Sequence, residues 1–379
     1  MSSRITRKRA RAEEEGEDLP PTKREPVEDN SQGAGPDAAG GAQADGQGST
    51  SGAQGFEKDK EFWFDDGTVI LVARNIEFRV YEGLLGGLSP VFKDMFQADG
   101  HAVRNVRVGK VQSFPCPVVH VSDSPEDLRR LLRACFSKRL GSLYKEQNPS
   151  YNEISAAIRL GDKYKITELY SQSLEYLKYY FPATFASYCA LKEYTPPGWN
   201  PFEEIGVVNL ARITGNLSIL PSAFVACICA ESTEPELEGI GHGIAREDGS
   251  QERLSPGDLT VCLEGKTRLR IATITAVLRT FKLTVSPECK TPTACKKAFL
   301  DVLLNLEKKV DELVAGDPLT RYTDFVSTPG GLAVCPSCTT MVGERNLKER
   351  RDVWDRLPEL LNIDVPGWGK EPSPPPSEP

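Results

Sequence analysis

The sequence predicts an α+β module, in which helices cover a small mixed sheet, followed by an all-helical carboxy-terminal region and flanked by disordered tails. Three observations support this fold class. Residues 68–80 have the pattern of a strand hairpin, Ser89-Pro90 is typical of a helix start, and apolar residues recur at helical spacing beyond residue 182. The expected segments are 1–58 as a disordered tail with a basic cluster, 59–181 as the sheet module, 182–232 as a helical extension, 233–257 as a flexible loop, 258–365 as the carboxy-terminal helical region and 366–379 as a second disordered tail.

The two tails are expected to lack a fixed structure because of their composition. Residues 1–58 contain an acidic run from Glu13 to Asp18 and then mainly Gly, Ala, Gln, Ser and Asp, while the last ten residues are rich in proline. Such segments cannot bury enough apolar surface to offset the entropy lost on ordering. Between the tails, a chain of 379 residues with 39% hydrophobic residues has room for an ordinary core.

The composition also limits the classes of partner. The formal net charge of -8 argues against a nucleic-acid surface spread over the whole protein. No window approaches the roughly 20 apolar residues of a membrane-spanning helix, and the charged start lacks the apolar stretch of a signal peptide. We therefore expect an intracellular protein, nuclear or cytoplasmic, with no membrane anchor and with its ten cysteines reduced.

The first half of the module is expected to contain a hairpin and short helices. Residues 68–73 are a run of strand formers and residues 76–80 alternate apolar with polar, with a turn at Arg74-Asn75. Ser89-Pro90 supplies an N-cap and a proline in the first turn, and the apolar residues that follow share one helical face. The stretch from Gln97 to Phe114 is longer and more basic than a connector needs, and no element is assigned to it.

The second half is expected to be one strand and three helices. Residues 117–121 are typical of a buried strand, and Ser124-Pro125 begins a helix with acidic residues in its first turn. Ser150 and Glu153 form a capping-box pattern, and a last helix follows with apolar residues from 170 to 181. The expected order in the module is strand, strand, helix, helix, strand, helix, helix, helix.

Beyond the module, apolar residues keep a helical period. Residues 182–231 predict two or three packed helices, and segments around 267–281, 293–314 and 344–362 predict a carboxy-terminal bundle. Residues 234–257 are polar and rich in Gly and Glu, which is typical of an exposed, flexible loop.

These elements together resemble the BTB/POZ domain. The resemblance rests on Phe62-Trp-Phe-Asp-Asp-Gly-Thr-Val-Ile-Leu-Val72, on Phe78-Arg-Val80, and on Leu84-Leu-x-x-Leu88-Ser-Pro-Val-Phe-Lys-Asp-Met-Phe96. It covers roughly residues 62–181 and is similar in particular to a fungal, basidiomycete-type group in which Phe-Trp-Phe-Asp-Asp-Gly opens the domain and helices follow. One departure is Val80-Tyr-Glu82, where many members have Ala-His-Arg.

The resemblance implies a compact module that binds other proteins, often as a homodimer through its amino-terminal segment and its leucine-rich helix. The candidate partner-binding residues are then Phe62, Trp63, Phe64, Leu84 and Leu85. The alternative is that all five fill the core of the monomer. In some members such a module joins a substrate receptor to a cullin ubiquitin ligase, and in others it joins a DNA-binding domain to corepressors. The chain lacks kelch repeats, a MATH-like domain and tandem zinc fingers, so both roles stay open.

Four cysteines have a spacing that suggests a metal site. Cys335-Pro-Ser-Cys338 is a two-residue knuckle, and Cys289 and Cys295 lie upstream. Four thiolates are the ligand set of a tetrahedral structural zinc site, although the first pair is spaced more loosely than usual. Buried or free thiols are the alternative, and a redox pair is disfavoured because no strand–helix thioredoxin pattern surrounds it. No other cofactor is expected.

A basic cluster in the first tail resembles a nuclear-import signal. Its residues are Arg7, Lys8, Arg9, Arg11, Lys23 and Arg24. One alternative is a solvated charge run that balances the acidic neighbours, and a weaker one is non-specific contact with nucleic acid.

No pattern in the sequence predicts an active site. The three histidines, His101, His120 and His242, have no catalytic partner beside them, and the motifs of hydrolases, nucleotide-binding loops and zinc peptidases are missing. Asp65-Asp66 fits a turn better than a pair of catalytic carboxylates. We therefore expect a non-enzymatic adaptor or scaffold that acts through the BTB/POZ-like module. The alternative is a nuclear transcription-associated regulator whose basic tail contacts nucleic acid.

Overall fold

The structure is a computed structural model that describes residues 55–108, 112–137, 144, 148–230, 238–308, 310–315, 317–321, 323 and 332–369. The basic cluster and the acidic run of the first tail lie outside these residues, as does the end of the chain from residue 370. The predicted tail over 366–379 begins too early, because residues 366–369 are described and Trp368 stacks on Trp354 with ring centroids 5.1 Å apart.

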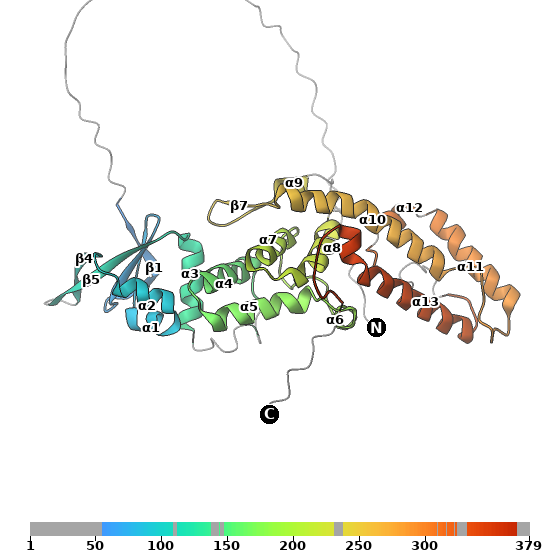
Figure 1. Ribbon diagram of the computed structural model, residues 1–379, viewed down its shortest axis with the longest axis horizontal. Helices are drawn as coiled ribbons and strands as arrows, with labels where there is room; N and C mark the ends of the chain where they lie inside the picture. Colours follow the sequence, from blue (N-terminus) through green and yellow to red (C-terminus); the bar gives the residue numbers. More distant parts are fainter. Residues whose placement is uncertain are drawn as a thin grey trace, which may run out of the picture. The chain divides into compact units, whose positions relative to one another are not determined.

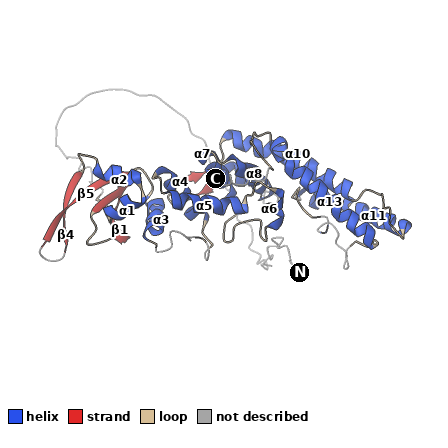
Figure 2. Ribbon diagram, turned by 60° about the horizontal axis from the view of Figure 1, so that its bottom comes forward, coloured by secondary structure: helices blue, strands red, loops and turns tan. Residues whose placement is uncertain are grey.

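The first module contains a five-stranded mixed sheet (Figure 2). Its strands are β1 (Glu57–Trp63), β2 (Val69–Ala73), β3 (Ile76–Val80), β4 (Ala102–Val108) and β5 (Gln112–Val121). They lie in the order β1-β3-β2-β5-β4, so β1 and β4 form the two edges. Strand β2 is central; it pairs antiparallel with β3 and parallel with β5.

The predicted hairpin is confirmed, and two strands of the sheet, β1 and β4, were missed; β1 begins at Glu57, inside the segment 1–58 that was predicted to be a disordered tail. Ala73 pairs with Ile76, and Arg74 takes the left-handed conformation, with φ 53°, that a two-residue turn requires. The stretch from Gln97 to Phe114, to which no element was assigned, contains β4, which pairs antiparallel with β5. Charged residues such as Arg104 and Arg107 break its apolar alternation, as is common in a strand at the edge of a sheet.

Five helices accompany the sheet, and apart from the extra strand β4 the elements after the hairpin follow the predicted order. They are α1 (Glu82–Leu88), α2 (Pro90–Gln97), α3 (Pro125–Phe136), α4 (Tyr151–Lys163) and α5 (Thr167–Tyr180). Figure 1 shows α1 and α2 beside the strands. Leu71 and Phe78 of the sheet, Phe92 of α2 and Leu132 of α3 are completely buried in one shared core. This core is the reason why the sheet needs the helices, since one face of β2 and β3 is apolar throughout.

The helix starts follow from single hydroxyl groups, as predicted. The Oγ atoms of Ser89, Ser124 and Ser150 accept hydrogen bonds from backbone N–H groups in the first turns of α2, α3 and α4. At α4 the Glu153 carboxylate also accepts from the Ser150 backbone N–H at 2.8 Å, which completes the capping box. Each cap satisfies groups that the helix itself cannot pair.

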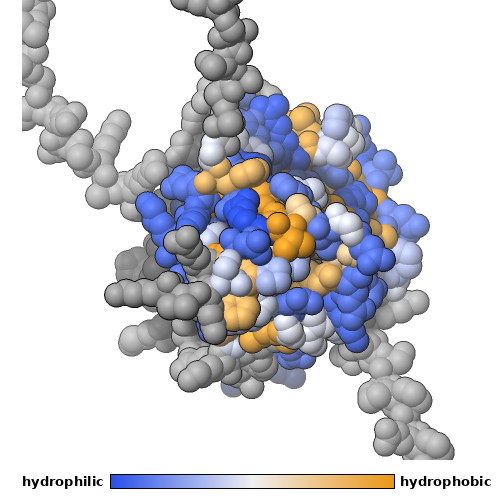
Figure 3. Space-filling view, turned by 90° about the vertical axis from the view of Figure 1, so that its left-hand side faces the viewer, coloured by the Kyte–Doolittle hydropathy of each residue, from blue (hydrophilic) through white to orange (hydrophobic). Residues whose placement is uncertain are grey.

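The opposite face of the sheet has its own small apolar cluster. Ile70, Val72, Cys116 and Val118 are buried there, with Trp63 and Val106 packed against them. Two buried charged residues, Glu77 and Arg79, share this face, and Arg104 of β4 reaches the Glu77 carboxylate at 2.7 Å. Figure 3, which views the molecule from the side of β4 and β5, shows apolar residues as separate patches among hydrophilic ones.

The rest of the described chain is mainly helical, as predicted. Its elements are α6 (Phe185–Ala190), α7 (Glu204–Thr214), a 3-10 helix (Leu217–Ile219), α8 (Leu220–Ala230), α9 (Glu238–His242), α10 (Pro256–Thr280), α11 (Pro292–Glu307), α12 (Val310–Ala315), α13 (Pro336–Asp355) and α14 (Leu357–Leu361). Their main core also contains residues of α4 and α5, so the module and the helical region share a continuous interior. Gly206 of α7 shows how close this packing is, because a Cβ there would lie 1.8 Å from the Tyr151 hydroxyl of α4.

A separate third core lies where α10, α11 and α13 meet. Val277 and Phe281 at the end of α10 pack with Phe299 of α11 and Val342 of α13. Cys295 and Cys338 belong to the same core and are buried with it. The end of the helical region is therefore stabilised by an apolar core of its own.

The predicted flexible loop over 233–257 is wrong for the part that the structure describes. From residue 238 this segment forms α9 and then a short antiparallel hairpin of β6 (Ile244–Ala245) and β7 (Gln251–Glu252). Most residues of the segment are exposed, but Glu252 is buried and Arg246 is largely covered, and both are held in ion pairs. Low hydrophobicity therefore did not indicate mobility here.

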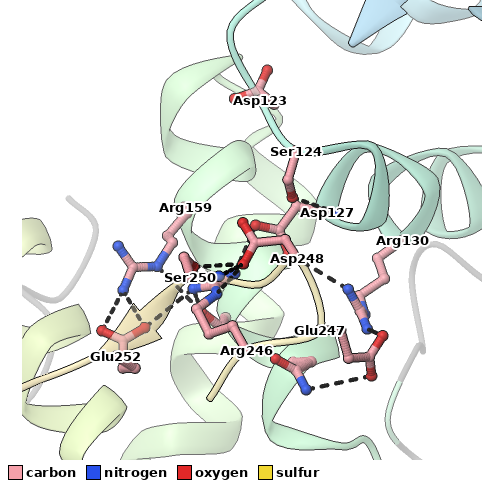
Figure 4. Close-up of polar contacts among 12 residues, drawn as sticks. Asp123, Ser124, Asp127, Arg130, Arg159, Arg246, Glu247, Asp248, Ser250 and Glu252 are labelled. Carbon is pink, nitrogen blue, oxygen red and sulfur yellow. Dashed lines mark hydrogen bonds and ion pairs between the residues drawn. The ribbon is translucent and has the colours of Figure 1, made fainter. Parts of the chain in front are cut away.

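A network of buried charges fixes this hairpin, and Glu252 is its centre (Figure 4). The Glu252 carboxylate is only 6% exposed and accepts from Arg159 of α4 at 2.9 Å and from Arg246 of the hairpin at 3.1 Å. Asn209 of α7 and Tyr151 of α4 also donate to it. Four partners, from α4, α7 and the hairpin itself, therefore satisfy one buried carboxylate.

Arg246 extends this network to the sheet module. Its guanidinium is 9% exposed and lies 2.7 Å from the Asp127 carboxylate in the first turn of α3. Figure 4 shows Arg246 between Asp127 and Glu252. Two more arginines hold the turn of the hairpin, because Arg130 of α3 pairs with Glu247 and Arg74 of the β2–β3 turn pairs with Asp248. The hairpin thus links α3, α4 and α7.

Substitution of Glu252 by leucine should destabilise the protein far more than loss of an exposed pair. Glu252→Leu leaves Arg159 and Arg246 short of a buried partner, and the expected loss in unfolding free energy is about 3–5 kcal/mol. Arg133→Met is the control, because Arg133 and Glu61 form an ion pair with side chains 54% and 41% exposed. Its expected loss is about 0–1 kcal/mol. Urea unfolding checks both values, and equal losses would contradict the role given to Glu252.

Candidate metal centre and candidate partner surface

The four cysteines predicted as metal ligands come together at the beginnings of two helices. Cys289 lies just before α11 and Cys295 lies in its first turn, while Cys335 is the N-cap of α13 and Cys338 lies in its first turn. Pro292 and Pro336 begin the two helices, where proline loses no intrahelical hydrogen bond. Each pair therefore faces the positive end of a helix dipole, which favours thiolate over thiol.

The distances between these cysteines fit one tetrahedral ion. All four Sγ atoms lie within 4.8 Å of one another, and the Cys335 and Cys289 sulfurs are 3.7 Å apart. Four sulfurs at about 2.3 Å from one zinc ion lie about 3.8 Å from each other, whereas a disulfide needs about 2.05 Å. The loose spacing of the first pair is no obstacle, because the fold brings the Cys289 and Cys295 sulfurs within 4.8 Å of each other.

The groups around the sulfurs already donate hydrogen bonds to them. The Ser286 N–H donates to Cys338 Sγ at 3.4 Å, and the Cys335 N–H donates to Cys295 Sγ at 3.3 Å. The N–H of Cys338 lowers the pKa of the Cys335 thiol to about 6, while burial raises the pKa of Cys338 to about 12. Backbone N–H groups that point at ligand sulfurs are the usual outer partners of a thiolate metal site.

A redox pair would use the two cysteines of the knuckle alone. Here two further thiols lie within ligand distance of them, and in the described chain these four are the cysteines that gather in one place. The arrangement therefore offers a complete set of four soft ligands with no position left for a water or substrate, which is typical of a structural metal site.

The five predicted partner-binding residues are placed very differently. Phe62 and Leu85 are buried in the core between sheet and helices. Phe64 is half-buried and stacks on Tyr81 with ring centroids 5.2 Å apart, and Trp63 lies on the other face of the sheet under Lys58. Leu84 is exposed on α1. Partner binding stays a prediction for this set, and Leu84 is the member that is available to a partner without rearrangement.

The remaining candidates give no site in the described residues. The basic cluster proposed for nuclear import, Arg7, Lys8, Arg9, Arg11, Lys23 and Arg24, lies outside them. Nε2 of His101 lies 2.7 Å from the Met95 carbonyl oxygen, and the His120 ring packs edge-on against Phe56.

The sequence analysis did not predict the Glu252 network. The alternation of Arg, Glu and Asp over 246–253 was the one signal of it in the sequence.

Comparison with known proteins adds no family to this picture. No protein-family model matches the sequence, and neither does any of the curated proteins searched. Within the described part of the chain, none of the helices combines the length and the apolar character that crossing a bilayer demands.

The burial of neighbouring leucines gives a direct test of their placement. Leu85→Ala should lower the unfolding free energy by about 2–5 kcal/mol, because it leaves a cavity in the core. Leu84→Ala should change it by less than about 0.5 kcal/mol, since Leu84 is exposed. Chemical unfolding of the two variants is the measurement, and the reverse order would show that α1 is rotated from its position here.

Proposed function

We propose that this protein is a non-enzymatic protein-interaction protein, an adaptor or scaffold, whose first module is BTB/POZ-like and binds a partner through α1. The partner is a second copy of the chain or another protein. What supports the proposal is the likeness of residues 62–96 to BTB/POZ sequences, together with the order of sheet and helices after it.

The observation that carries the proposal is the surface around Leu84. Leu84 is 41% exposed, while the adjacent Leu85 is completely buried. Gly83 precedes it and Gly87 lies about one helical turn after it, and a Cβ at either glycine would meet no atom within 4 Å. The surface is thus one leucine beside bare backbone, which lets the backbone of a partner approach closely.

Leu84→Asp should remove the association. A charge cannot be buried in an apolar contact without a partner, so the complex should weaken at least tenfold or disappear. Light scattering of the purified proteins measures the mass of the wild type and of the variant. Affinity capture with the tagged wild type and the tagged variant identifies the proteins that each one binds.

Leu347→Asp is the matched control, because Leu347 is an exposed leucine of α13 in the helical region. It should keep the wild-type mass and partners. If Leu84→Asp, correctly folded, keeps the same mass and every partner as well, α1 is not the binding surface.

We further propose that Cys289, Cys295, Cys335 and Cys338 bind one structural zinc ion. The support is the arrangement of the four sulfurs within 4.8 Å. Zinc would join the start of α11 to the start of α13 and so stabilise the third core, to which Cys295 and Cys338 belong. Metal binding to such a site is folding energy for the segment that carries it.

Purified protein should contain about one zinc ion per chain, from the four-thiolate coordination of the site. Cys338→Ser should lower the zinc content severalfold and reduce thermal stability, whereas Cys189→Ser should change neither. Cys189 is half-buried and packs against the main helical core, away from the four cysteines. Elemental analysis of the three proteins is the measurement. A wild type without metal, refolded in the presence of zinc and still empty, would refute the proposal.

A further inference from the structure

Strand β4 has one backbone edge that no other strand of the described chain pairs with. It lies at one end of the strand order, and its seven residues pair with β5 in a continuous antiparallel register. Figure 2 shows β4 on the side of the module that faces away from α10 and α13. An open strand edge is a row of N–H and C=O groups that can form hydrogen bonds with a further strand.

Two prolines in β5 show which backbone groups of β4 point outward. Val103 pairs with Pro117, and Asn105 pairs with Pro115. Because proline has no N–H, neither pair can be one in which the two residues exchange hydrogen bonds. The exchanging pairs are therefore those of residues 102, 104, 106 and 108. The N–H and C=O groups of residues 103, 105 and 107 then point away from β5.

The other edge of the sheet, at β1, is protected. The register of β1 against β3 shifts within the strand. Two arginines of α3 also bind side chains of β1, because Arg129 lies 2.6 Å from the Asp59 carboxylate and Arg133 lies 2.6 Å from that of Glu61. Irregular pairing and covering side chains keep a strand edge from pairing with another chain. Of the two edges, β4 is therefore the regular one.

The sequence of β4 is complementary to a second copy of itself. The strand reads Ala102-Val-Arg-Asn-Val-Arg-Val108, with Asn105 at its middle. When two copies pair antiparallel about Asn105, residue 104 lies opposite residue 106 and residue 103 lies opposite residue 107, so each arginine faces a valine. All seven residues pair, and the two central residues, whose backbone groups point outward, exchange hydrogen bonds with each other. A register centred on Arg104 would instead place two arginines opposite each other.

The charges of β4 do not oppose this pairing. In the register centred on Asn105, the Arg104 residues of the two copies are diagonal neighbours, about 7–8 Å apart. Each is already paired within its own chain, because the Arg104 guanidinium lies 2.7 Å from the buried Glu77 carboxylate. Val103 is 60% exposed, and Asn105 is exposed as well. Pairing reduces the exposed apolar surface of Val103 and brings together two Asn105 amides, each of which is both a donor and an acceptor.

We propose that the β4 edges of two chains pair antiparallel about Asn105 and join the two sheets into one continuous sheet. The contact is two-fold symmetric, so it closes as a dimer in which the same strand serves both chains. A strand of a different protein would form similar backbone hydrogen bonds, but it would not bring residue 105 against a second residue 105. The inference goes beyond the proposed function, because it gives the module a surface for self-association that is separate from α1.

Disulfide cross-linking tests the register directly. In the proposed dimer the two Cα atoms of residue 105 lie about 5.5 Å apart, within the range of about 4.4–6.8 Å that a disulfide spans. Full-length Asn105→Cys should therefore form a covalent dimer on mild oxidation, detected on a non-reducing gel. Val103→Cys is the matched control on the same face of the same strand. The two copies of residue 103 lie four positions apart, about 13 Å, which is too far for a disulfide.

A second measurement does not depend on cysteine chemistry. Asn105→Pro removes the central outward N–H but no N–H that bonds to β5, so the chain should stay folded and the dimer should weaken at least tenfold in light scattering. Asn105→Ala keeps the N–H and should keep the dimer.

Both measurements are made with Leu84→Asp also present, so that failure of the α1 surface and failure of the β4 contact are distinguishable. In that background the chain should still be a dimer. A monomer there, no covalent dimer of Asn105→Cys, equal cross-linking of Val103→Cys, or an unchanged dimer of Asn105→Pro would each overturn the inference.

Discussion

A buried carboxylate, Glu252, is the constraint on which the arrangement of this protein depends. A charge removed from water must be paired and hydrogen-bonded, or the fold that buries it is not stable. Its partners come from α4, α7 and the β6–β7 hairpin, and one of them, Arg246, also pairs with α3. The network therefore requires these elements to be in place at the same time, in addition to the apolar core that α4 and α5 share with the helical region.

This constraint has a functional consequence. The exposed Leu84 belongs to the sheet module, whereas the four cysteines belong to the helical region. The Glu252 network and the shared core link the two regions, so a partner bound at the proposed α1 surface would be held in a fixed position relative to the helical region. The metal proposed at the four cysteines would add a second link, because it would join the start of α11 to the start of α13 beside the third core.

The sequence predicted the elements whose signals are local. The turn at Arg74-Asn75, the serine caps of α2, α3 and α4, and most of the later helices depend on residues within a few positions of one another. The β6–β7 hairpin was missed because its stability comes from arginines more than 80 residues away, as with Arg159 and Glu252, which are separated by 93 positions. Strand β4 was missed because its edge position allows charges that break the apolar pattern.

For the candidate sites, too, the sequence indicated residue types but not their positions in the tertiary fold. The four cysteines could be named from their spacing and residue type, but that they meet at two helix starts is a property of the tertiary fold. Phe62 and Leu85 are buried in the core of the module, which was the alternative to partner binding. The sequence could not decide between the two, because an apolar residue type does not show whether the side chain faces the core or the surface.

The most direct test of the account is whether the sheet module and the helical region unfold together. Amide hydrogen exchange of the full-length protein in increasing urea, followed by mass spectrometry, reports on peptides from β2–β3 and from α7–α8 separately. We expect the β2–β3 and α7–α8 peptides to lose protection at the same urea concentration, because the Glu252 network and the shared core join the two regions. Loss of protection in β2–β3 while α7–α8 stays protected would show two independent units and would contradict it.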